Sequence, residues 1–392
     1  MKFSSRFIKI SLTAAGLALI TGVAFTQFRP HDLPSKAIVT KKPAAKKITV
    51  QTKPQKEFII AKGLHVTGWI AGGKNSLQKL IDLCNKTELN ALCIDVRDSD
   101  GVVSFDTNVP LERQIKASRH CIADIKGVMA KLKENDIYPI ARIVVFKDPI
   151  LATAVPEMAV KRTDGSLWRD HRGIAWANPY DKRVWDYTID IAIECAKLGF
   201  KEIQWDYVRF PSDGRVSQCV YRGKTDQTES EVIADFLKYA RNRLEPYGVV
   251  ISADLFGLTS LVKHDMGIGQ TIKMIAENVD YICPMVYPSH YALGEYNIPN
   301  PNKAPYKTAF LSLRDAVKQL KGTKCKIRPW LQDFSLYGVH YGPAEVLAQR
   351  KAAREVGLTE FLLWNPRCKY TEAALAKSKP QQESSVKRGS SE

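Results

Sequence analysis

The sequence predicts a single (β/α)8 barrel, and three patterns support this fold class. From residue 63 onward, eight short runs with β-strand character alternate with amphipathic helical runs. Eight strands, each followed by a helix, is the count of a closed parallel barrel. Several strand-to-helix connections are unusually long, as in barrels with a loop-built cleft. No Gly-rich phosphate loop follows the first strand, so the alternative of a doubly wound open sheet is less well supported.

The strands and helices are predicted from the spacing of apolar residues, which repeats every two residues in a strand and about every 3.6 residues in a helix. Strands are expected at 64–69, 91–96, 138–146, 202–207, 249–255, 281–286, 326–332 and 360–364. Helices are expected near 75–86, 119–134, 181–198, 229–245, 268–277, 306–320, 342–356 and 371–377. Four long insertions follow strand ends, at 97–118, 147–179, 209–228 and 287–305. All four should therefore project from the face that carries the active site in such barrels.

The net charge of +17 over 392 residues comes mainly from the two ends of the chain. Residues 1–56 contribute +10 and residues 377–392 contribute +2, which leaves +5 for the part between them. A modestly basic globule gives little support to nucleic-acid binding, so no nucleic-acid partner is expected.

The N-terminus has the pattern of an export signal. Three basic residues precede an apolar run over residues 10–25. Residues 1–26 are interpreted as a signal peptide or as an uncleaved signal anchor that would attach the protein to a membrane. The protein is therefore expected to be exported, whether secreted, periplasmic or in the cell envelope.

The remaining boundaries follow from composition. Residues 27–59 are rich in Lys and Pro and contain few large apolar residues, so they are predicted to be a disordered linker. Residues 60–376 are the predicted barrel domain, and residues 377–392 are a predicted disordered tail.

Several common catalytic and metal-binding motifs are missing from the sequence. None of the eight Cys forms a CxxC pair, and neither HxH, HExxH nor GxSxG occurs. Cys93, Cys195 and Cys283 lie in apolar stretches and are expected to be core residues. No cofactor and no metal is expected.

A cluster of charged residues follows the second predicted strand. It comprises Asp95, Arg97, Asp98 and Asp100. A hard cation would need a converging set of oxygens that the sequence does not identify. A solvated loop with an Arg–Asp pair is the preferred interpretation.

Two carboxylates are predicted at the ends of neighbouring strands. Because side chains alternate faces, Gln204 and Asp206 should point into the barrel while Trp205 and Tyr207 face the helices. Asp254 ends the fifth strand in the same way. Paired carboxyl groups at this spacing are what glycoside hydrolysis requires, one as proton donor and the other as nucleophile or base.

The alternative for either carboxylate is a structural ion pair with Arg142 or Arg209. Aromatic and polar residues at the other strand ends suit a sugar-binding pocket, because aromatic rings stack on sugars and polar groups bind hydroxyls. The candidate substrate-binding residues are Trp69, Asp95, Arg97, Arg142, Tyr207, Arg209, Tyr287, Trp330, Gln332, Trp364 and Asn365.

Longer motifs resemble a bacterial family of glycoside-hydrolase-like proteins that was formerly a domain of unknown function. The motifs are GLHVTGW at 63–69, ARIVVFKD at 141–148, DYVRFPSDG at 206–214, SADLFG at 252–257, MVYPSHY at 285–291 and RPWLQDF at 328–334. The resemblance covers about residues 60–375. The sequence departs from the family pattern at Trp205, where Phe is usual, and around residues 365–368.

The resemblance implies a TIM-type barrel with a glycosidase-like site and a catalytic role for Asp206. The leading hypothesis is a glycosidase that acts on an extracellular or cell-wall polysaccharide with Asp206 and Asp254 as its carboxylate pair. The alternatives are a non-catalytic glycan-binding barrel anchored at the cell envelope, and a morphogenetic partner protein that makes contact through its basic linker.

Overall fold

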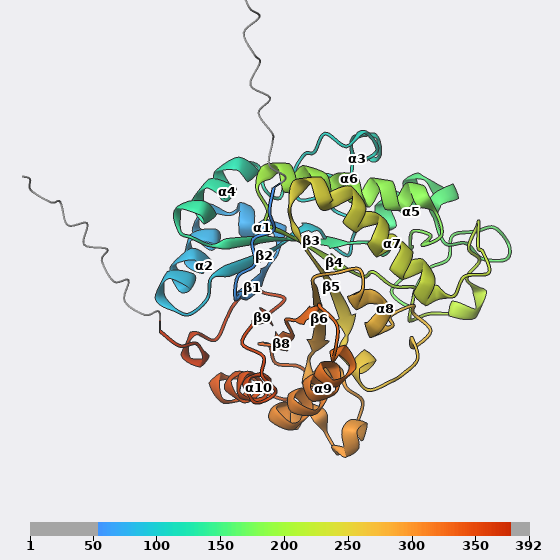
Figure 1. Cartoon of the computed structure of the whole chain (residues 1–392). Helices are drawn as coiled ribbons and strands as arrows, with labels where there is room; N and C mark the ends of the chain where they lie inside the picture. The colour runs from blue at the N-terminus through green and yellow to red at the C-terminus, as the bar shows by residue number, and fades with distance from the viewer. Residues whose placement is uncertain (1–53, 378–392) are drawn as a thin grey trace, which may run out of the picture. The chain divides into compact units, whose positions relative to one another are not determined.

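Parallel strands close into a barrel in the computed structural model, which describes residues 54–377 (Figure 1). The strands are β1 Lys62–Val66, β2 Ala91–Arg97, β3 Tyr138–Val144, β4 Glu202–Asp206, β5 Val250–Phe256, β6 Tyr281–Val286, β7 Lys326–Ile327, β8 Trp330–Gln332 and β9 Phe361–Trp364. β1 pairs with both β2 and β9, and β5 pairs with β6, so the ring is complete. The short β7 and β8 both pair with β6 and together occupy the seventh position of the barrel.

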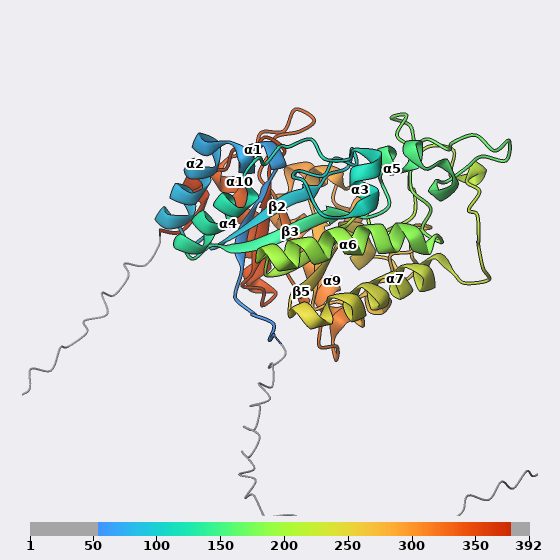
Figure 2. The same cartoon turned by 90° about the horizontal axis from the view of Figure 1, so that it is seen from above.

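Helices cover the outside of this ring (Figure 2). They are α1 Gly68–Gly72, α2 Lys74–Lys86, α3 Pro110–Ile115, α4 Ile125–Glu134, α5 Pro149–Ala154, α6 Lys182–Leu198, α7 Glu229–Leu244, α8 Ile272–Ala276, α9 Pro305–Leu320 and α10 Pro343–Glu355. Local sequence sets their ends. Thr228 and Glu231 form a capping box at the start of α7, and α6 ends at Gly199, whose φ of 101° favours glycine.

Strand side chains alternate between two layers, as the sequence predicted. Trp205 of β4 is fully buried on the helix side, where its ring meets Phe236 of α7 edge-on at 5.5 Å. Gln204 points into the barrel, accepting a hydrogen bond from Cys93 Sγ at 2.8 Å and donating one to Cys283 Sγ at 3.1 Å. The small thiols come from β2 and β6, each separated from β4 by one strand, and the Gln204 amide reaches both of them across the barrel interior. The core placement predicted for Cys93 and Cys283 is confirmed, and all eight cysteines are free.

Eight predicted strands correspond to the eight positions of the barrel, with two corrections nearby. The first strand ends at Val66, so Trp69 does not end a strand. It lies in α1 with 68% of its surface exposed. The helix expected at 371–377 is only a 3-10 turn, Glu372–Ala374.

Residues 54–61 run across the N-terminal end of the barrel. Lys56 pairs with Asp280 at 2.5 Å, and the Phe58 ring lies 6.4 Å from that of Tyr281. Residues 54–59, which composition assigned to the linker, therefore contact the barrel. The predicted signal segment, the rest of the linker and nearly all of the tail lie outside the described residues.

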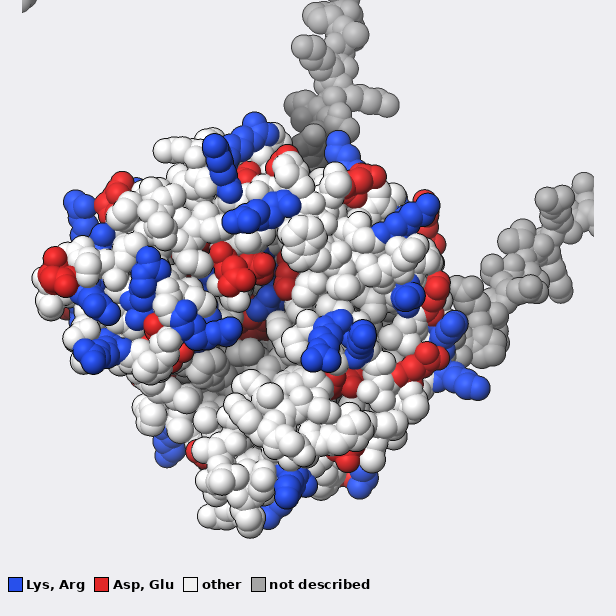
Figure 3. Space-filling model, turned by 180° about the vertical axis from the view of Figure 1, so that it is seen from behind, with Lys and Arg blue, Asp and Glu red and all other residues white. Residues whose placement is uncertain are grey.

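Within residues 54–377, no helix has the length and apolar character needed to cross a membrane. On the face of the barrel shown in Figure 3, basic side chains are interspersed with acidic ones rather than gathered in one large patch. This agrees with the small net charge that the sequence gives for the region between the two ends.

The long insertions follow the C-terminal ends of the strands, as predicted. Two of them pair with each other: Lys161, in the β3–α6 loop, and Val220, in the β4–α7 loop, form an antiparallel bridge. Trp168 Nε1 also donates a hydrogen bond to the Arg215 carbonyl at 3.0 Å. These contacts hold the two loops together beyond α5, where Figure 1 shows them in green and yellow.

Candidate active site

A cavity of about 500 Å³ opens at the C-terminal ends of the strands. Its wall comes from β3, β4, β5, β6 and β9 and from the loops that follow them. Its lining residues include Arg142, Asp206, Tyr207, Arg209, Asp213, Phe256, Tyr287 and Trp364. A volume of this size suits a small ligand or a few sugar units of a longer chain.

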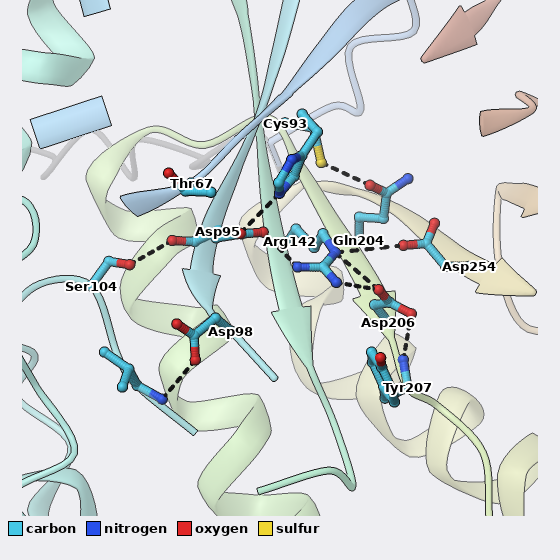
Figure 4. A network of polar contacts seen from close by, with 12 residues as sticks. Thr67, Cys93, Asp95, Asp98, Ser104, Arg142, Gln204, Asp206, Tyr207 and Asp254 are labelled. Carbon is cyan, nitrogen blue, oxygen red and sulfur yellow. Dashed lines mark hydrogen bonds and ion pairs between the residues drawn. The ribbon is translucent and has the colours of Figure 1, made fainter. Parts of the chain in front are cut away.

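Arg142 of β3 is the centre of the polar network in this cavity (Figure 4). Its Nε donates to Asp206 Oδ2 at 3.0 Å, and its Nη2 donates to the same oxygen. Nη1 donates to Asp95 Oδ1 at 2.5 Å, and Nε lies 3.9 Å from Asp254 Oδ2. One arginine thus joins carboxylates from β2, β4 and β5. The ion pair that the sequence offered as an alternative is present.

Asp254 is the most enclosed of these carboxylates. It is 1% exposed, and Trp330 Nε1 donates to its Oδ1 at 2.7 Å. Its Oδ2 is buried and has no hydrogen-bond partner among residues 54–377. Burial, followed by the charge of Asp206, raises the pKa of Asp254 well above its ordinary value. Unlike Asp206, Asp254 does not line the cavity.

Asp95 and His65 form an ion pair beside this group. His65 Nε2 lies 2.9 Å from Asp95 Oδ2, and the imidazole stacks on Trp364 at 3.8 Å. Burial opposes the imidazolium, but the Asp95 carboxylate outweighs it and raises the pKa of His65 to about 9. Burial likewise opposes the Asp95 charge, but His65 and Arg142 lower the pKa of Asp95 to about 2.

His65 was not among the candidate residues, although the sequence contained the signal for it. Leu64 and Val66 on either side are buried in the apolar layer outside the strands. Alternation along β1 therefore turns His65 into the barrel.

Tyr207 lies in the cavity wall, which corrects the face predicted for it. Its φ of 47° is left-handed, so strand alternation ends at this residue. Its backbone N–H donates to Asp206 Oδ1 at 2.6 Å, which fixes the carboxylate as the chain turns. Tyr207 is thus brought to the cavity, and its role as a substrate-binding residue stays a prediction.

Arg97 is not in the cavity, contrary to the expectation that it binds substrate. A β-bulge shifts the β2–β3 register between Asp95 and Arg97, so the two side chains no longer share a face. Arg97 is fully buried, donates to the Val144 carbonyl at 2.8 Å and to Thr188 Oγ1 of α6 at 2.9 Å, and lies 3.4 Å from Asp148. It fastens β3 to α6.

The remaining candidates divide between the cavity and its support. Arg209, Tyr287 and Trp364 line the cavity. Trp330 is fully buried and holds Asp254. Gln332 accepts from Ser289 N at 3.0 Å and donates to the Phe334 carbonyl at 2.8 Å, so it connects two loops. Asn365 Nδ2 donates to the Lys369 carbonyl at 2.6 Å and closes the turn after β9.

The acidic cluster after β2 does not converge on a cation. Asp95 turns to Arg142, whereas Asp98 accepts the backbone N–H groups of Asp100 at 2.9 Å and Val102 at 3.0 Å. In the described part of the chain, no three His, Cys, Asp or Glu side chains are placed to hold a metal ion together.

Comparison with solved structures shows the same fold in glycoside hydrolases. The glycoside hydrolase domain of PgaB (BpsB) from Bordetella bronchiseptica is 14% identical, with a TM-score of 0.59 over 81% of this chain and 99% of that one. The α-galactosidase TtGalA from Thermus thermophilus is 10% identical, with a TM-score of 0.51 over 82% of this chain and 65% of that one. At these identities the likeness shows the fold alone.

A hypothetical protein from Ruminiclostridium thermocellum is nearer in sequence, at 41% identity over 49% of this chain and 96% of that one, with a TM-score of 0.46. No curated protein matches the sequence. A family model described as "Putative glycosyl hydrolase domain" matches residues 63–370, which is most of the chain. The protein therefore belongs to this family of glycosyl hydrolase domains.

Proposed function

We propose that the protein is a glycosidase that cleaves an extracellular or cell-wall polysaccharide, with Asp206 and Asp254 as its carboxylate pair. The observation that carries the proposal is that both carboxylates approach one guanidinium atom, Arg142 Nε, beside a cavity wide enough for sugars. Since that atom is 3.0 Å from one Oδ2 and 3.9 Å from the other, the two oxygens are at most 6.9 Å apart. Paired acids in glycosidases operate over such separations.

The two carboxylates have different environments, as acid and base need. Asp206 faces the cavity, and its charge is stabilised by Arg142 and by the Tyr207 N–H, which suits a nucleophile or general base. Asp254 is sealed and its pKa is raised by burial and by Asp206, which suits the group that holds the proton. The assignment is therefore Asp206 as base or nucleophile and Asp254 as the source of the proton.

Asp254 needs a path to the sugar because it does not line the cavity. Tyr287 does line the cavity, and its hydroxyl is buried without a hydrogen-bond partner in the described part of the chain. Burial, followed by the charges of Asp254 and Asp206, raises the pKa of Tyr287, so that its hydroxyl keeps its proton. We assign Tyr287 the role of giving its hydroxyl proton to the leaving oxygen while it takes the proton of Asp254. Because neither Asp254 Oδ2 nor the Tyr287 hydroxyl has a hydrogen-bond partner in the described residues, this role requires the two atoms to come into hydrogen-bond contact when the sugar binds.

The aromatic wall supplies the binding surface. Tyr207, Phe256, Tyr287 and Trp364 line the cavity around the carboxylates. Such rings stack on the apolar faces of sugars, while the charged groups between them bind hydroxyls. This arrangement supports a carbohydrate as the ligand under either of the functions considered.

The test compares the full chain with its Asp206→Asn, Asp254→Asn and Tyr287→Phe variants. Reducing ends released from amino-sugar polymers, wall glycans and neutral polysaccharides are measured, together with binding to the same panel. Asp315→Asn is the control, because that carboxylate belongs to a surface ion pair with Arg314. We expect release by the wild type and the control, a loss of about a thousandfold or more in the Asp206 variant, and smaller losses in the other two.

A second candidate function is a non-catalytic glycan-binding barrel. It is favoured by the ion pair in which Arg142 holds Asp206 with two nitrogens, and by the enclosure of Asp254. Binding without any product, unchanged in the Asp254 variant, would support this function and contradict the proposed glycosidase.

A further inference from the structure

Arg209 is a buried cation at the cavity wall for which the described part of the chain supplies no carboxylate partner. It is 6% exposed, and it lines the same cavity as Asp206. Enclosing a guanidinium without a counter-ion is costly, so buried arginines are normally paired. Burial lowers the pKa of Arg209, which agrees with an incomplete set of partners.

The nearby carboxylates are used elsewhere. Asp206 is held by Arg142, and Asp170 lies 4.0 Å from Lys147. Asp213 also lines the cavity and favours the Arg209 charge from a distance, but it forms no ion pair with Arg209. Three aromatic rings surround the guanidinium instead, with Tyr207 and Trp176 at 5.0 Å and Phe256 at 4.6 Å. Such cation–π contacts offset part of the desolvation cost.

The hydrogen bonds of Arg209 leave one edge of its guanidinium available. Nη1 donates to the Phe210 carbonyl at 2.9 Å and to Ser212 Oγ at 3.0 Å. Nε and Nη2 have no partner among residues 54–377, and neither atom is sealed from solvent. These two nitrogens form the edge that receives a carboxylate with two parallel hydrogen bonds.

Arg142 provides the internal comparison. It uses the same two atoms, Nε and Nη2, to hold Asp206 at the neighbouring position of the cavity. The cavity thus contains two arginines. In Arg142 the edge formed by Nε and Nη2 holds a protein carboxylate, whereas in Arg209 the same edge has no partner among the described residues. Since the open edge belongs to a residue that lines the cavity, a ligand in the cavity can supply the missing partner.

We propose that the cavity recognises an acidic glycan and that Arg209 binds the carboxylate of one of its sugar units. This inference deepens the proposed function by naming the substrate class. A planar carboxylate fits the edge with two hydrogen bonds, whereas a sugar hydroxyl satisfies only one of the two nitrogens. The aromatic rings around Arg209 exclude water and strengthen the interaction.

The test measures affinity, or kcat/KM where product forms, for oligosaccharides of hexuronic acids and for the same oligosaccharides with each carboxyl reduced to an alcohol. The full-length wild type is compared with Arg209→Gln and Arg209→Lys. Arg215→Gln, which changes an exposed arginine of the same loop, is the control. Two further ligands are measured. A glycan whose carboxyls are on lactyl ether groups tests whether the carboxylate can come from such a group instead of from a hexuronic acid. A sulfated neutral oligosaccharide tests whether another anion is preferred to a carboxylate.

We expect the wild type and Arg215→Gln to prefer the acidic form by about tenfold or more, which corresponds to about 1.4 kcal/mol. Arg209→Gln should reduce that preference to near one, whatever its effect on the affinity for the reduced form. Arg209→Lys should retain part of the preference for the acidic form, because the positive charge stays while the two parallel N–H donors of the guanidinium are lost. Thermal unfolding of each variant separates these effects from misfolding.

Equal affinity of the wild type for the acidic and reduced forms would overturn the inference, as would an unchanged preference in a folded Arg209→Gln variant. Preference for the sulfated sugar over every carboxylate would overturn it as well. Binding of the acidic glycan without product would contradict the glycosidase but not the recognition by Arg209. Cleavage of neutral glycans alone would contradict carboxylate binding by Arg209 but would agree with the proposed glycosidase activity.

Discussion

The two ends of the barrel each bury an arginine between carboxylates, yet the two groups differ in their surroundings and in their hydrogen bonds. At the N-terminal end, Arg328 Nη1 donates to both oxygens of Glu202 at 2.8 Å, and Nε donates to Glu360 at 2.9 Å. At the C-terminal end, Arg142 joins Asp95, Asp206 and Asp254. The chemistry is similar, but only the C-terminal group adjoins the sugar-sized cavity.

Every carboxylate oxygen of the N-terminal group accepts a hydrogen bond. Ser252 Oγ donates to Glu202 at 2.5 Å, while Ala61 N and Tyr281 OH donate to Glu360, each at 3.2 Å. The Arg328 guanidinium also lies 3.9 Å from the Tyr281 ring centroid. None of the buried polar atoms of these side chains lacks a partner.

The C-terminal group is incomplete. His65 Nδ1, Asp254 Oδ2 and the Tyr287 hydroxyl are buried without a hydrogen-bond partner in the described residues. Each such atom costs about 1–3 kcal/mol. Sites that are strained or unsatisfied within an otherwise consistent fold are where function is expected. A buried Arg–carboxylate group is therefore expected to stabilise the barrel where every carboxylate oxygen is hydrogen-bonded, and to bind the proposed ligand where buried atoms lack hydrogen bonds.

The largest effect on folding should follow from breaking the N-terminal group. Arg328→Met leaves Glu202 and part of Glu360 buried without their cation, and the free energy of unfolding should fall by about 3–5 kcal/mol. Urea denaturation measures this change. Arg314→Met, which removes an exposed arginine from its pair with Asp315, is the control and should cost less than about 1 kcal/mol. A loss for Arg328→Met no larger than that of the control would show that the N-terminal group is not a stabilising one.

At the C-terminal end, the stability supplied by His65 should depend on pH. Its folded pKa of about 9 exceeds the ordinary value of 6.5, so the folded state binds the proton more tightly. Its contribution is then fully present below about pH 6.5 and is lost as the pH rises through about 9. His65→Gln should cost about 3 kcal/mol at about pH 6 and much less at about pH 10. Unfolding curves that differ equally at both pH values would contradict the ion pair with Asp95.

The sequence predicts the C-terminal Arg–carboxylate group of the barrel better than the N-terminal one. The eight strand positions and the inward aspartates followed from hydrophobic alternation, and the structure brings Asp206 and Asp254 to the same arginine. Alternation also places Glu202 on the inner face with Gln204 and Asp206. Its pairing with Arg328, 126 residues away, needed the closed ring.

The errors arose where the backbone departs from the regular strand. A bulge turned Arg97 outward, and the left-handed conformation of Tyr207 reversed its face. Neither feature has a Gly or Pro to mark it in the sequence. Trp69 was misplaced because the first strand ends three residues earlier than expected and α1 begins at Gly68.

The smallest effect should come from substituting Trp69, and this substitution tests where the binding site ends. The side chain is 68% exposed and does not line the cavity. Trp69→Ala should change the free energy of unfolding by less than about 0.5 kcal/mol and leave glycan binding unchanged. Trp364→Ala, which removes a ring of the cavity wall, is the comparison and should weaken binding. A loss of binding in the Trp69 variant would extend the site over α1.

The account is tested most directly by measuring stability and activity together in Asp254→Asn and Glu202→Gln. The raised pKa of Asp254 means that its folded form holds a proton which the unfolded chain has released above about pH 4, so this group costs stability as the pH rises. At about pH 9 we predict that Asp254→Asn is at least as stable as the wild type but hydrolyses glycan more slowly. Glu202→Gln should be destabilised by about 3 kcal/mol or more and should keep its activity when folded. An Asp254→Asn variant that is destabilised yet fully active would contradict the division of roles between the two ends of the barrel.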